Sequence, residues 1–324
     1  MSQPLLSIIC PAHNAQHRVG ALLAHVHEVL ARHAEVEVII IDDGSRDETP
    51  QILGQASQDA CPERLKILLE PSNRGPSAAR NRGIHAAQGR YVCFLDDDDT
   101  FELRSLATLV SQLAGLDADV ITINMQEVCD GRHRVIQHPE LPIGGGVGYL
   151  RHTLETQGNL ITAVCAYAFR REFLARIGWS FPEGLLHEDC LSTPLALLQA
   201  RSIWHHRPIM YRYQRRPDSI TTSRTNTSQR ASDLLTICEG LMRRGHRSDQ
   251  ATALALLAYQ FQLMSQAWKL AGVDMPPAFR QRALSLRTAL LRQHRRWVML
   301  RWTPSALLRK RYLRRVRTCL IQVK

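Results

Sequence analysis

The first part of the chain alternates between short apolar segments and segments with helical spacing. Four segments are almost entirely apolar, and each ends in polar residues; they are Leu6–Cys10, Glu37–Ile41, Leu65–Leu69 and Tyr91–Leu95. Apolar runs of this length are typical of strands buried on both faces. Between them, apolar residues recur at helical spacing over residues 19–30, and a short helix around Ile84 is predicted to end at Gly89. Strands that alternate with helices predict a mostly parallel, Rossmann-like α/β sheet with helices on both faces.

Polar side chains follow each of these predicted strands. Asn14 follows the first strand, Asp42 and Asp43 follow the second, Asn73 follows the third and Asp96–Asp99 follow the fourth. In an open parallel sheet, residues just beyond the carboxyl ends of the strands line the ligand crevice. A turn explains one polar strand end, whereas four in succession predict a polar ligand at this edge of the sheet.

Four carboxylates stand in a row after the fourth strand, at Asp96, Asp97, Asp98 and Asp99. Adjacent like charges repel, so a cation would stabilise them. A hard divalent cation such as Mg²⁺ or Mn²⁺ prefers carboxylate oxygens and commonly keeps coordination positions for phosphate. The alternative is a solvated acidic turn without a ligand, which is common for an isolated charge run. The polar ends of the three preceding strands favour the ligand.

Six short motifs carry a resemblance to a known protein family. In chain order they are Ser7–Asn14, Ile41–Ser45, Asn73–Gly83, Gly89–Asp99, His187–Asp189 and Tyr211–Thr221. Together they resemble a family 2 glycosyltransferase of the GT-A fold, an inverting type found in bacterial surface-polysaccharide synthesis. The first four motifs are specific in their order and spacing, and the resemblance spans about residues 5–222. His13 departs from the family pattern, in which an aromatic residue is more common.

The resemblance implies a nucleotide-sugar donor, taken here as a UDP-sugar, at the acidic edge of the sheet. Asp43 would accept a hydrogen bond from the base, Asp96 would face the ribose and Asp98 would hold the divalent cation. Asp97 would serve either the ribose or the cation, and Arg80 would lie near the diphosphate. The implied donor-binding residues are Pro11, Ala12, Asn14, Asp42, Asp43, Asn73, Gly75, Arg80, Asp96 and Asp97, and the implied metal ligands are Asp98 and Asp96.

Several of these residues also have a purely structural explanation. Asp42 and Asp43 precede Gly44, and an Asp-Gly pair favours a turn by itself. Arg80 could lie on a helix surface and form an ion pair with the acidic strand end. Asp99 could cap the next helix, predicted at residues 102–113, as aspartate often does.

Sugar transfer also needs a general base for the acceptor hydroxyl. Glu188 and Asp189 match the Glu-Asp motif of the family, which implies Asp189 as the base and Glu188 as a residue that orients the site or the acceptor. A base and a leaving group on opposite faces of the sugar imply one displacement that inverts the anomeric centre. Alternatively, because an apolar helix follows, the two carboxylates could serve only as its cap and dipole partners.

Length, charge and cysteine content bound the remaining possibilities. The 324 residues suffice for a catalytic domain, predicted at 1–225, and a helical, strongly basic region, predicted at 226–324. The net charge of +11 belongs to the end of the chain, since residues 280–324 contain 14 Lys or Arg and no Asp or Glu. Eight scattered cysteines without a CxxC pair indicate reduced thiols of a cytoplasmic protein. Neither a signal peptide nor an apolar stretch of about 20 residues is evident.

The last segment, Thr303–Lys324, is predicted to form an amphipathic helix. Leu308, Tyr312 and Val316 recur at helical spacing, and many of the other positions are basic. Such a helix fits the surface of an anionic membrane, or it packs on the catalytic domain with a solvated basic face. Binding of nucleic acid is a third interpretation, disfavoured because no nucleic-acid-binding fold is recognisable.

These observations predict a metal-dependent inverting glycosyltransferase that moves a sugar from a nucleotide-sugar to a glycan or lipid-linked acceptor in cell-surface polysaccharide synthesis. It is expected in the cytoplasm, with peripheral contact to the inner face of the plasma membrane. The alternative from another class is a non-catalytic nucleotide-sugar or glycan-binding protein of the same fold. The presence of both Asp98 and Asp189 argues against that alternative, and no nucleic-acid partner is expected.

Overall fold

The computed structural model describes residues 3–59, 63–129, 131–140, 144–215, 226–245, 250–272 and 276–298. The chain divides into two compact units, each described by itself. The sheet unit comprises Met1–Ile143, Ala163–Gly184 and Ala200–Ser219, and the helix unit comprises Gly144–Thr162, Leu185–Gln199 and Ile220–Lys324. The domain boundary predicted after residue 225 falls at the end of an undescribed segment, and the helix predicted at Thr303–Lys324 lies outside the described residues. Both stay predictions.

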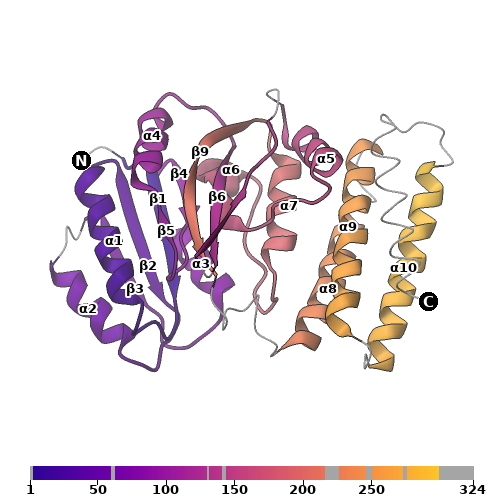
Figure 1. The fold of residues 1–324 in the computed structure, drawn as a ribbon, viewed down its shortest axis with the longest axis horizontal. Helices are drawn as coiled ribbons and strands as arrows, with labels where there is room; N and C mark the ends of the chain where they lie inside the picture. Colours follow the sequence, from indigo (N-terminus) through magenta and orange to yellow (C-terminus); the bar gives the residue numbers. More distant parts are fainter. Residues whose placement is uncertain are drawn as a thin grey trace. The chain divides into compact units, whose positions relative to one another are not determined.

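Four parallel strands form one half of the sheet, in the order β3-β2-β1-β4 (Figure 1). They are β1 (Leu6–Ala12), β2 (Val36–Asp42), β3 (Leu65–Leu69) and β4 (Tyr91–Phe94), and they alternate with α1 (Val19–Arg32), α2 (Thr49–Asp59) and α3 (Pro76–Ala86). Right-handed crossovers, the rule for such units, place α1 and α2 on one face and α3 on the other. The predicted alternation of strands and helices is confirmed for all four strands.

The third predicted strand is less buried than expected. β3 lies at the edge of the sheet and pairs only with β2. Its side chains are mostly half-buried, and Leu69 is 51% exposed. The prediction of burial on both faces is therefore wrong for β3, because an apolar run does not report where its strand lies in the sheet.

The helix predicted to end at Gly89 ends earlier, at Ala86. The backbone amides that follow the helix donate instead to the buried carboxylate of Glu37, near the start of β2. This carboxylate accepts hydrogen bonds from Ser7 Oγ (2.6 Å), Lys66 Nζ (2.8 Å), Gln88 N (2.6 Å) and Gly89 N (2.9 Å). A Cβ on Gly89 would lie 2.6 Å from the Ser7 nitrogen. Gly89 is therefore required by close approach to β1 and is not a helix cap.

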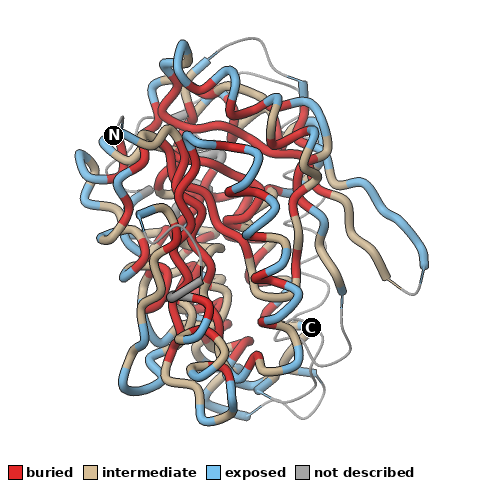
Figure 2. Tube along the Cα trace, turned by 90° about the vertical axis from the view of Figure 1, so that its left-hand side faces the viewer, coloured by how far each residue is buried: buried red, intermediate tan, exposed pale blue. Residues whose placement is uncertain are grey.

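Beyond β4 the sheet is mixed. The order continues β8-β6-β9-β5, and β7 pairs with β6. The strands are β8 (Tyr167–Arg170), β6 (Val120–Cys129), β9 (Ile203–Gln214), β5 (Thr100–Phe101) and β7 (Arg132–Ile136), with α4 (Leu103–Leu113), the 3-10 turn η1 (Val164–Ala166) and α6 (Arg171–Arg176) between them. β9 is parallel to β6, whereas β8, β5 and β7 are antiparallel to their neighbours. The described strands form one nine-stranded sheet whose central strands are buried (Figure 2).

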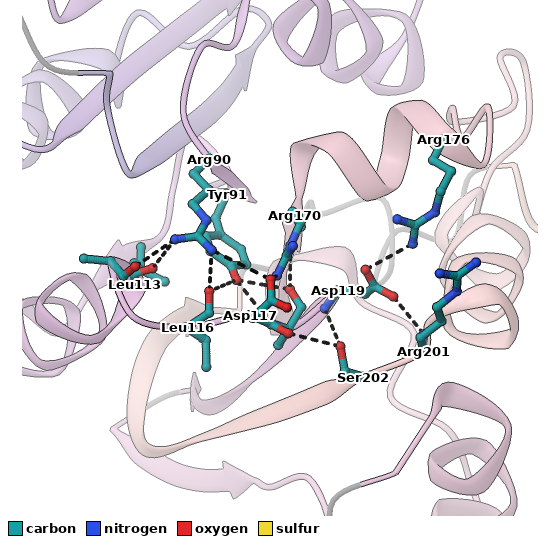
Figure 3. A network of polar contacts seen from close by, with 12 residues as sticks. Arg90, Tyr91, Leu113, Leu116, Asp117, Asp119, Arg170, Arg176, Arg201 and Ser202 are labelled. Carbon is teal, nitrogen blue, oxygen red and sulfur yellow. Dashed lines mark hydrogen bonds and ion pairs between the residues drawn. The ribbon is translucent and has the colours of Figure 1, made fainter.

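A polar network secures the end of the sheet at which β4 and β6 begin (Figure 3). Asp119, directly before β6, is buried and accepts from Arg176 Nη2 at 3.1 Å and from the Arg201 amide at 2.8 Å. Asp117 pairs with Arg170, but its own side chain is 82% exposed. The buried carboxylate therefore joins three segments of the sheet unit, whereas the exposed one forms a surface ion pair.

The helix unit contains α5 (Gly146–Thr156), α7 (Asp189–Gln199), α8 (Thr227–Gly245), α9 (Gln250–Ala271) and α10 (Pro277–Val298). α8 and α9 pack along each other, and α10 contacts both. α5 crosses α7 closely, since a Cβ on Gly146 would lie 1.5 Å from the carbonyl oxygen of Leu197. Of the helices in the described part of the chain, none has both the length and the apolar character to span a membrane.

Replacing Asp119 by alanine is expected to lower the free energy of unfolding by about 1–3 kcal/mol, because the Arg201 amide loses its acceptor. The matched change Asp117→Ala removes a carboxylate that is mostly exposed, and it should cost no more than about 1 kcal/mol. Urea unfolding followed by circular dichroism measures both values. Equal losses in the two variants would show that the buried network adds nothing beyond a surface ion pair.

Candidate active site

Side chains join the loops that follow β1 and β2. Asp42 accepts hydrogen bonds from the Ser45 amide (3.1 Å) and hydroxyl (2.5 Å). The Ser45 oxygen accepts from the Asn14 amide (2.8 Å), and the Asn14 side-chain oxygen accepts from the Arg46 amide (3.0 Å). Asn14 has a φ of 46°, a left-handed conformation that asparagine adopts more readily than most residues. Asp42 and Asn14 therefore shape the loops themselves, as the turn interpretation of Asp42 expects.

The Asp43 carboxylate holds the loop that follows β3. Its two oxygens accept from the amides of Arg74 (2.9 Å) and Gly75 (2.7 Å), and the residue is 4% exposed. Gly75, the N-cap of α3, has a φ of 89°, which favours glycine. Each carboxylate oxygen has a second lone pair. Asp43 can therefore hold this loop and still accept a hydrogen bond from a ligand.

His13 brings two of the predicted donor-binding residues together. Its Nδ1 lies 2.9 Å from the Asp43 carbonyl oxygen, which can only accept, so Nδ1 carries the proton. Nε2 is then an acceptor, and it accepts from the side-chain amides of Asn73 (2.8 Å) and Asn14 (3.1 Å). The histidine that departs from the family pattern thus orients both asparagines.

Two of the four carboxylates after β4 are paired with arginines from different parts of the chain. Asp97 receives two hydrogen bonds from Arg18, the residue before α1, from Nε (3.2 Å) and Nη2 (2.8 Å). Asp96 accepts from Nη2 of Arg80, on α3, at 2.8 Å. Arg80 is 8% exposed, and its guanidinium carbon lies 5.6 Å from the centre of the Phe181 ring. The predicted ion pair of Arg80 with the acidic strand end is present, although Arg80 is buried and not on a helix surface.

The interpretation of Asp99 as a helix cap is wrong. The N-cap of α4 is Glu102, whose carboxylate accepts from the Ser105 amide at 2.7 Å. Asp99 is 2% exposed and accepts instead from the Tyr211 hydroxyl (2.5 Å) and the Gln214 amide (2.7 Å) of β9. Three residues separate Asp99 from the first residue of α4, and the last of these three, Glu102, is the N-cap.

Tyr211 links the side chain of Asp99 to the backbone of Asp96. Its hydroxyl donates to Asp99 and accepts from the Asp96 amide at 3.2 Å. Burial, followed by the charges of Asp96 and Asp98, raises the pKa of Asp99 to about 8, even though the hydrogen bonds to it favour the ionised form. The sequence interpretation gave no role to Tyr211 or Arg18. A tyrosine within a strand and an arginine before a helix do not reveal their partners. The signals were the need to compensate four carboxylates and, for Tyr211, its place at the start of a family motif.

The acidic strand end fits a divalent cation that is bound partly by its substrate. Among the residues that the structure describes, no three or more His, Cys, Asp or Glu side chains are grouped to hold a metal ion. A Mg²⁺ site made of one or two carboxylates and completed by phosphate oxygens and water needs no such group. Asp98 and Asp96 supply hard oxygen ligands of this kind, so the residues present fit a cation that binds together with a diphosphate.

The predicted acceptor-side residues belong to the helix unit. His187, with a φ of 65°, and the buried Glu188 lead into Asp189, the first residue of α7. The Glu188 carbonyl accepts from the Ser192 amide at 2.9 Å, as in the first turn of a helix. A carboxylate at this position interacts favourably with the helix dipole. The cap interpretation and the general-base interpretation of Asp189 are therefore both compatible with its place in the fold.

Comparisons of the sequence with known proteins identify one family. The sequence profile of Glycosyl transferase family 2 matches residues 7–178. The succinoglycan biosynthesis protein ExoO of Rhizobium meliloti (strain 1021) is 32% identical over 142 residues, which are 43% of this chain and 38% of ExoO. Across three other curated relatives, the matched part spans 38% to 63% of the relative's length.

Two solved structures share the fold. S. aureus TarS 1–349 in complex with UDP-GlcNAc has 20% identity and a TM-score of 0.62, with 97% of this chain and 90% of that chain covered. The mannosyltransferase PcManGT from Pyrobaculum calidifontis, in complex with GDP-Man and Mn²⁺, has 18% identity and a TM-score of 0.57, with 99% and 86% covered. At these identities the likeness shows the fold alone. It confirms the predicted GT-A fold followed by a helical extension.

Tyr211→Phe is expected to lower the free energy of unfolding by about 1–3 kcal/mol, because the half-buried Asp96 amide and the buried Asp99 carboxylate lose a partner. Affinity for UDP, the nucleotide that the family resemblance implies, should fall as well in calorimetry, since the Asp99 carboxylate and the Asp96 backbone lose their support. Tyr91→Phe is the matched control: its hydroxyl bonds the carbonyls of Leu116 and Ala118, away from the acidic strand end. The control should lose stability and keep its UDP affinity. Unchanged stability of Tyr211→Phe would contradict the assigned role.

Proposed function

This chain belongs to glycosyl transferase family 2, and we propose that it transfers a sugar from a UDP-sugar to a hydroxyl group of a glycan or lipid-linked acceptor, with inversion of the anomeric centre. One observation carries the proposal. The loops after β1, β2 and β3 are bound to one another at the sheet edge where β4 ends in four carboxylates. Such an edge is where α/β sheets bind nucleotides.

The donor lies along this edge. Pro11, Ala12 and Asn14 border the base and ribose, and Asp43 accepts a hydrogen bond from the base through its remaining lone pairs. The pairing of Ala12 with Asp42 in the β1–β2 register supports this arrangement, since it brings the two strand ends side by side. Asp96 faces the ribose and Asp97 lies between the ribose and the cation, while Asp42, Asn73 and Gly75 support the loops around the ribose. Arg80, a buried cation at the acidic strand end, compensates charge on the diphosphate.

A divalent cation, Mg²⁺ or Mn²⁺, would be held by Asp98 and Asp96. When bound, it would neutralise the negative charge that builds on the departing diphosphate. Two observations support this role. Burial, followed by the charges of Asp96 and Asp98, raises the pKa of Asp99, so a further negative charge at this strand end is disfavoured and a cation is favoured. A protein of the same fold, PcManGT, was solved with GDP-Man and Mn²⁺.

Asp189 is the general base. The acceptor oxygen forms a bond to the anomeric carbon while its proton passes to the Asp189 carboxylate. The bond between the anomeric carbon and the diphosphate oxygen breaks, and its electron pair leaves with the diphosphate. Attack from the face opposite the leaving group inverts the anomeric centre, and Glu188 orients the acceptor. Support comes from the resemblance of Glu188 and Asp189 to the Glu-Asp motif of the family, and the place of Asp189 at a helix start is compatible with this role.

The acceptor is a growing surface glycan or a lipid-linked sugar. The name of ExoO, a succinoglycan biosynthesis protein, supports a surface polysaccharide. A lipid-linked acceptor lies at a membrane, and the basic residues 280–324 favour peripheral contact with anionic lipid on its cytoplasmic face. A non-catalytic nucleotide-sugar binder would bind the same donor without turnover. A nucleic-acid-binding protein would bind duplex of any sequence with steep salt dependence.

A panel of UDP-GlcNAc, UDP-glucose, UDP-galactose and GDP-mannose tests the donor and the metal. Ligand binding to the folded state raises stability, so one nucleotide-sugar should raise Tm in Mg²⁺ or Mn²⁺ and release its nucleoside diphosphate. Asp98→Asn should lose the metal-dependent part of this response and stay folded, because it relieves repulsion. Asp117→Asn, an exposed carboxylate elsewhere, is the control. Full turnover in excess EDTA would refute the metal role, and a flat response to the whole panel would refute the donor class.

Asp189→Asn keeps the shape of the side chain and removes the proton acceptor. Loss of a positioned base typically lowers the rate by ~10²–10⁴-fold, while the Tm shift caused by the panel's best donor should persist. Nucleoside diphosphate release measures the rate, and NMR of the product reports the anomeric configuration. Near-normal turnover would make Asp189 a helix cap only, and a retained configuration would rule out the single displacement.

A further inference from the structure

We infer that α8 positions the candidate catalytic carboxylates, Glu188 and Asp189, through its residues Asp233 and Arg230. This role rests on the proposed function of Asp189 as general base. It gives a task to a helical region in which the sequence shows no chemical motif. Contacts within the helix unit hold the backbone on both sides of the two carboxylates.

Asp233 fixes the backbone just before the two carboxylates. The residue is 3% exposed; its Oδ2 accepts from the Leu186 amide at 2.9 Å, and its Oδ1 accepts from Gln229 Nε2 at 2.7 Å. A buried carboxylate is costly unless it is hydrogen-bonded, and here both oxygens are. Because Leu186 lies two residues before Glu188, the position of its amide sets the path by which the chain enters α7.

Arg230 holds the next residue, His187. Arg230 is 8% exposed, and its Nε–H donates to His187 Nε2 at 3.1 Å. Since arginine cannot accept, Nε2 carries no proton and the ring is neutral with its proton on Nδ1. Burial, followed by the charge of Arg230, lowers the pKa of His187, against the opposing charges of Glu188 and Asp233. His187 also has a φ of 65°, a left-handed conformation that is uncommon for residues other than glycine and that its surroundings must maintain.

A third contact lies on the far side of the pair. The buried Tyr259 of α9 donates its hydroxyl hydrogen to the Cys190 carbonyl at 3.0 Å. The segment is therefore held at Leu186 and His187 by α8 and at Cys190 by α9, with Glu188 and Asp189 between. A general base must lie within hydrogen-bond reach of the proton that it takes, and a displacement of about 1 Å can cost ~10²-fold in rate.

A positioning role and a purely structural role give different results. If α8 only stabilises the fold, a variant loses activity in proportion to the fraction unfolded, wherever on the helix it lies. If α8 positions the carboxylates, kcat falls in fully folded protein and KM for the donor stays unchanged, because the donor residues belong to the sheet unit. A variant that keeps an acceptor for the Leu186 amide should then recover activity.

The experiment compares Asp233→Ala, Asp233→Asn and Glu239→Ala in the full chain, with the nucleotide-sugar of the panel that gives the highest turnover. Glu239 is the matched control. It is an acidic residue of α8, but it pairs with Arg282 of α10, at 2.9 Å, and not with the segment that carries Glu188 and Asp189. We expect a fall in kcat of roughly 10–10²-fold for Asp233→Ala, near-normal kcat for Asp233→Asn, and no change in KM. Hydrogen exchange at residues 186–190 should accelerate in Asp233→Ala and stay slow in Glu239→Ala.

Wild-type kcat in folded Asp233→Ala, or an equal loss in Glu239→Ala, would overturn the inference. If Asp233→Ala does not fold, Arg230→Gln decides: a normal kcat there overturns the role, and a lower kcat with unchanged donor KM supports it. Asp189→Asn is measured alongside. If that variant keeps its turnover, the base assignment fails, whereas an inactive Asp189→Asn beside a fully active Asp233→Ala removes the positioning role alone.

Discussion

Repulsion within the row of four adjacent carboxyl groups at the end of β4 is the constraint on which the sheet edge depends. Two unit charges 4 Å apart interact by about 1 kcal/mol in bulk water and about 4 kcal/mol near a protein surface. The protein offsets this repulsion with Arg18 before α1, Arg80 on α3 and Tyr211 on β9. Because each partner comes from a different part of the chain, compensating the charges also fixes these elements against β4.

The compensation is incomplete, and that has a chemical consequence. Burial, followed by the charges of Asp96 and Asp98, raises the pKa of Asp99 to about 8, so this strand end disfavours a further negative charge. A ligand with a diphosphate brings more negative charge, and it would be repelled unless a cation came with it. The arrangement that organises the fold therefore also favours a cation and a diphosphate that bind together, which is the physical basis of the proposed metal dependence.

The parallel half of the sheet was predictable because its signals are local: an apolar run, a polar end and a helical repeat follow one another in the chain. The mixed half was not. β5 has two residues and β8 has four, too few for any periodicity, and both find their partners far away in the sequence. The same reason hid the contact of Tyr211 with Asp99, which are 112 positions apart, so Asp99 could be mistaken for a local cap. The motif residues were recognisable singly, whereas the contacts that hold them were not.

Five of the buried carboxylates in the described residues share one structural task. Each accepts hydrogen bonds from amides of a loop or strand end that lies far away in the chain: Glu37 from Gly89, Asp43 from Gly75, Asp99 from Gln214, Asp119 from Arg201 and Asp233 from Leu186. Such amides have no ladder partner, and a charged acceptor binds them more strongly than a neutral one. A loop that must present side chains at a fixed position therefore gains most from a buried acid behind it. By this reasoning Asp233 holds the Glu188–Asp189 segment in the helix unit in the same way as Asp43 holds the loop after β3 in the sheet unit.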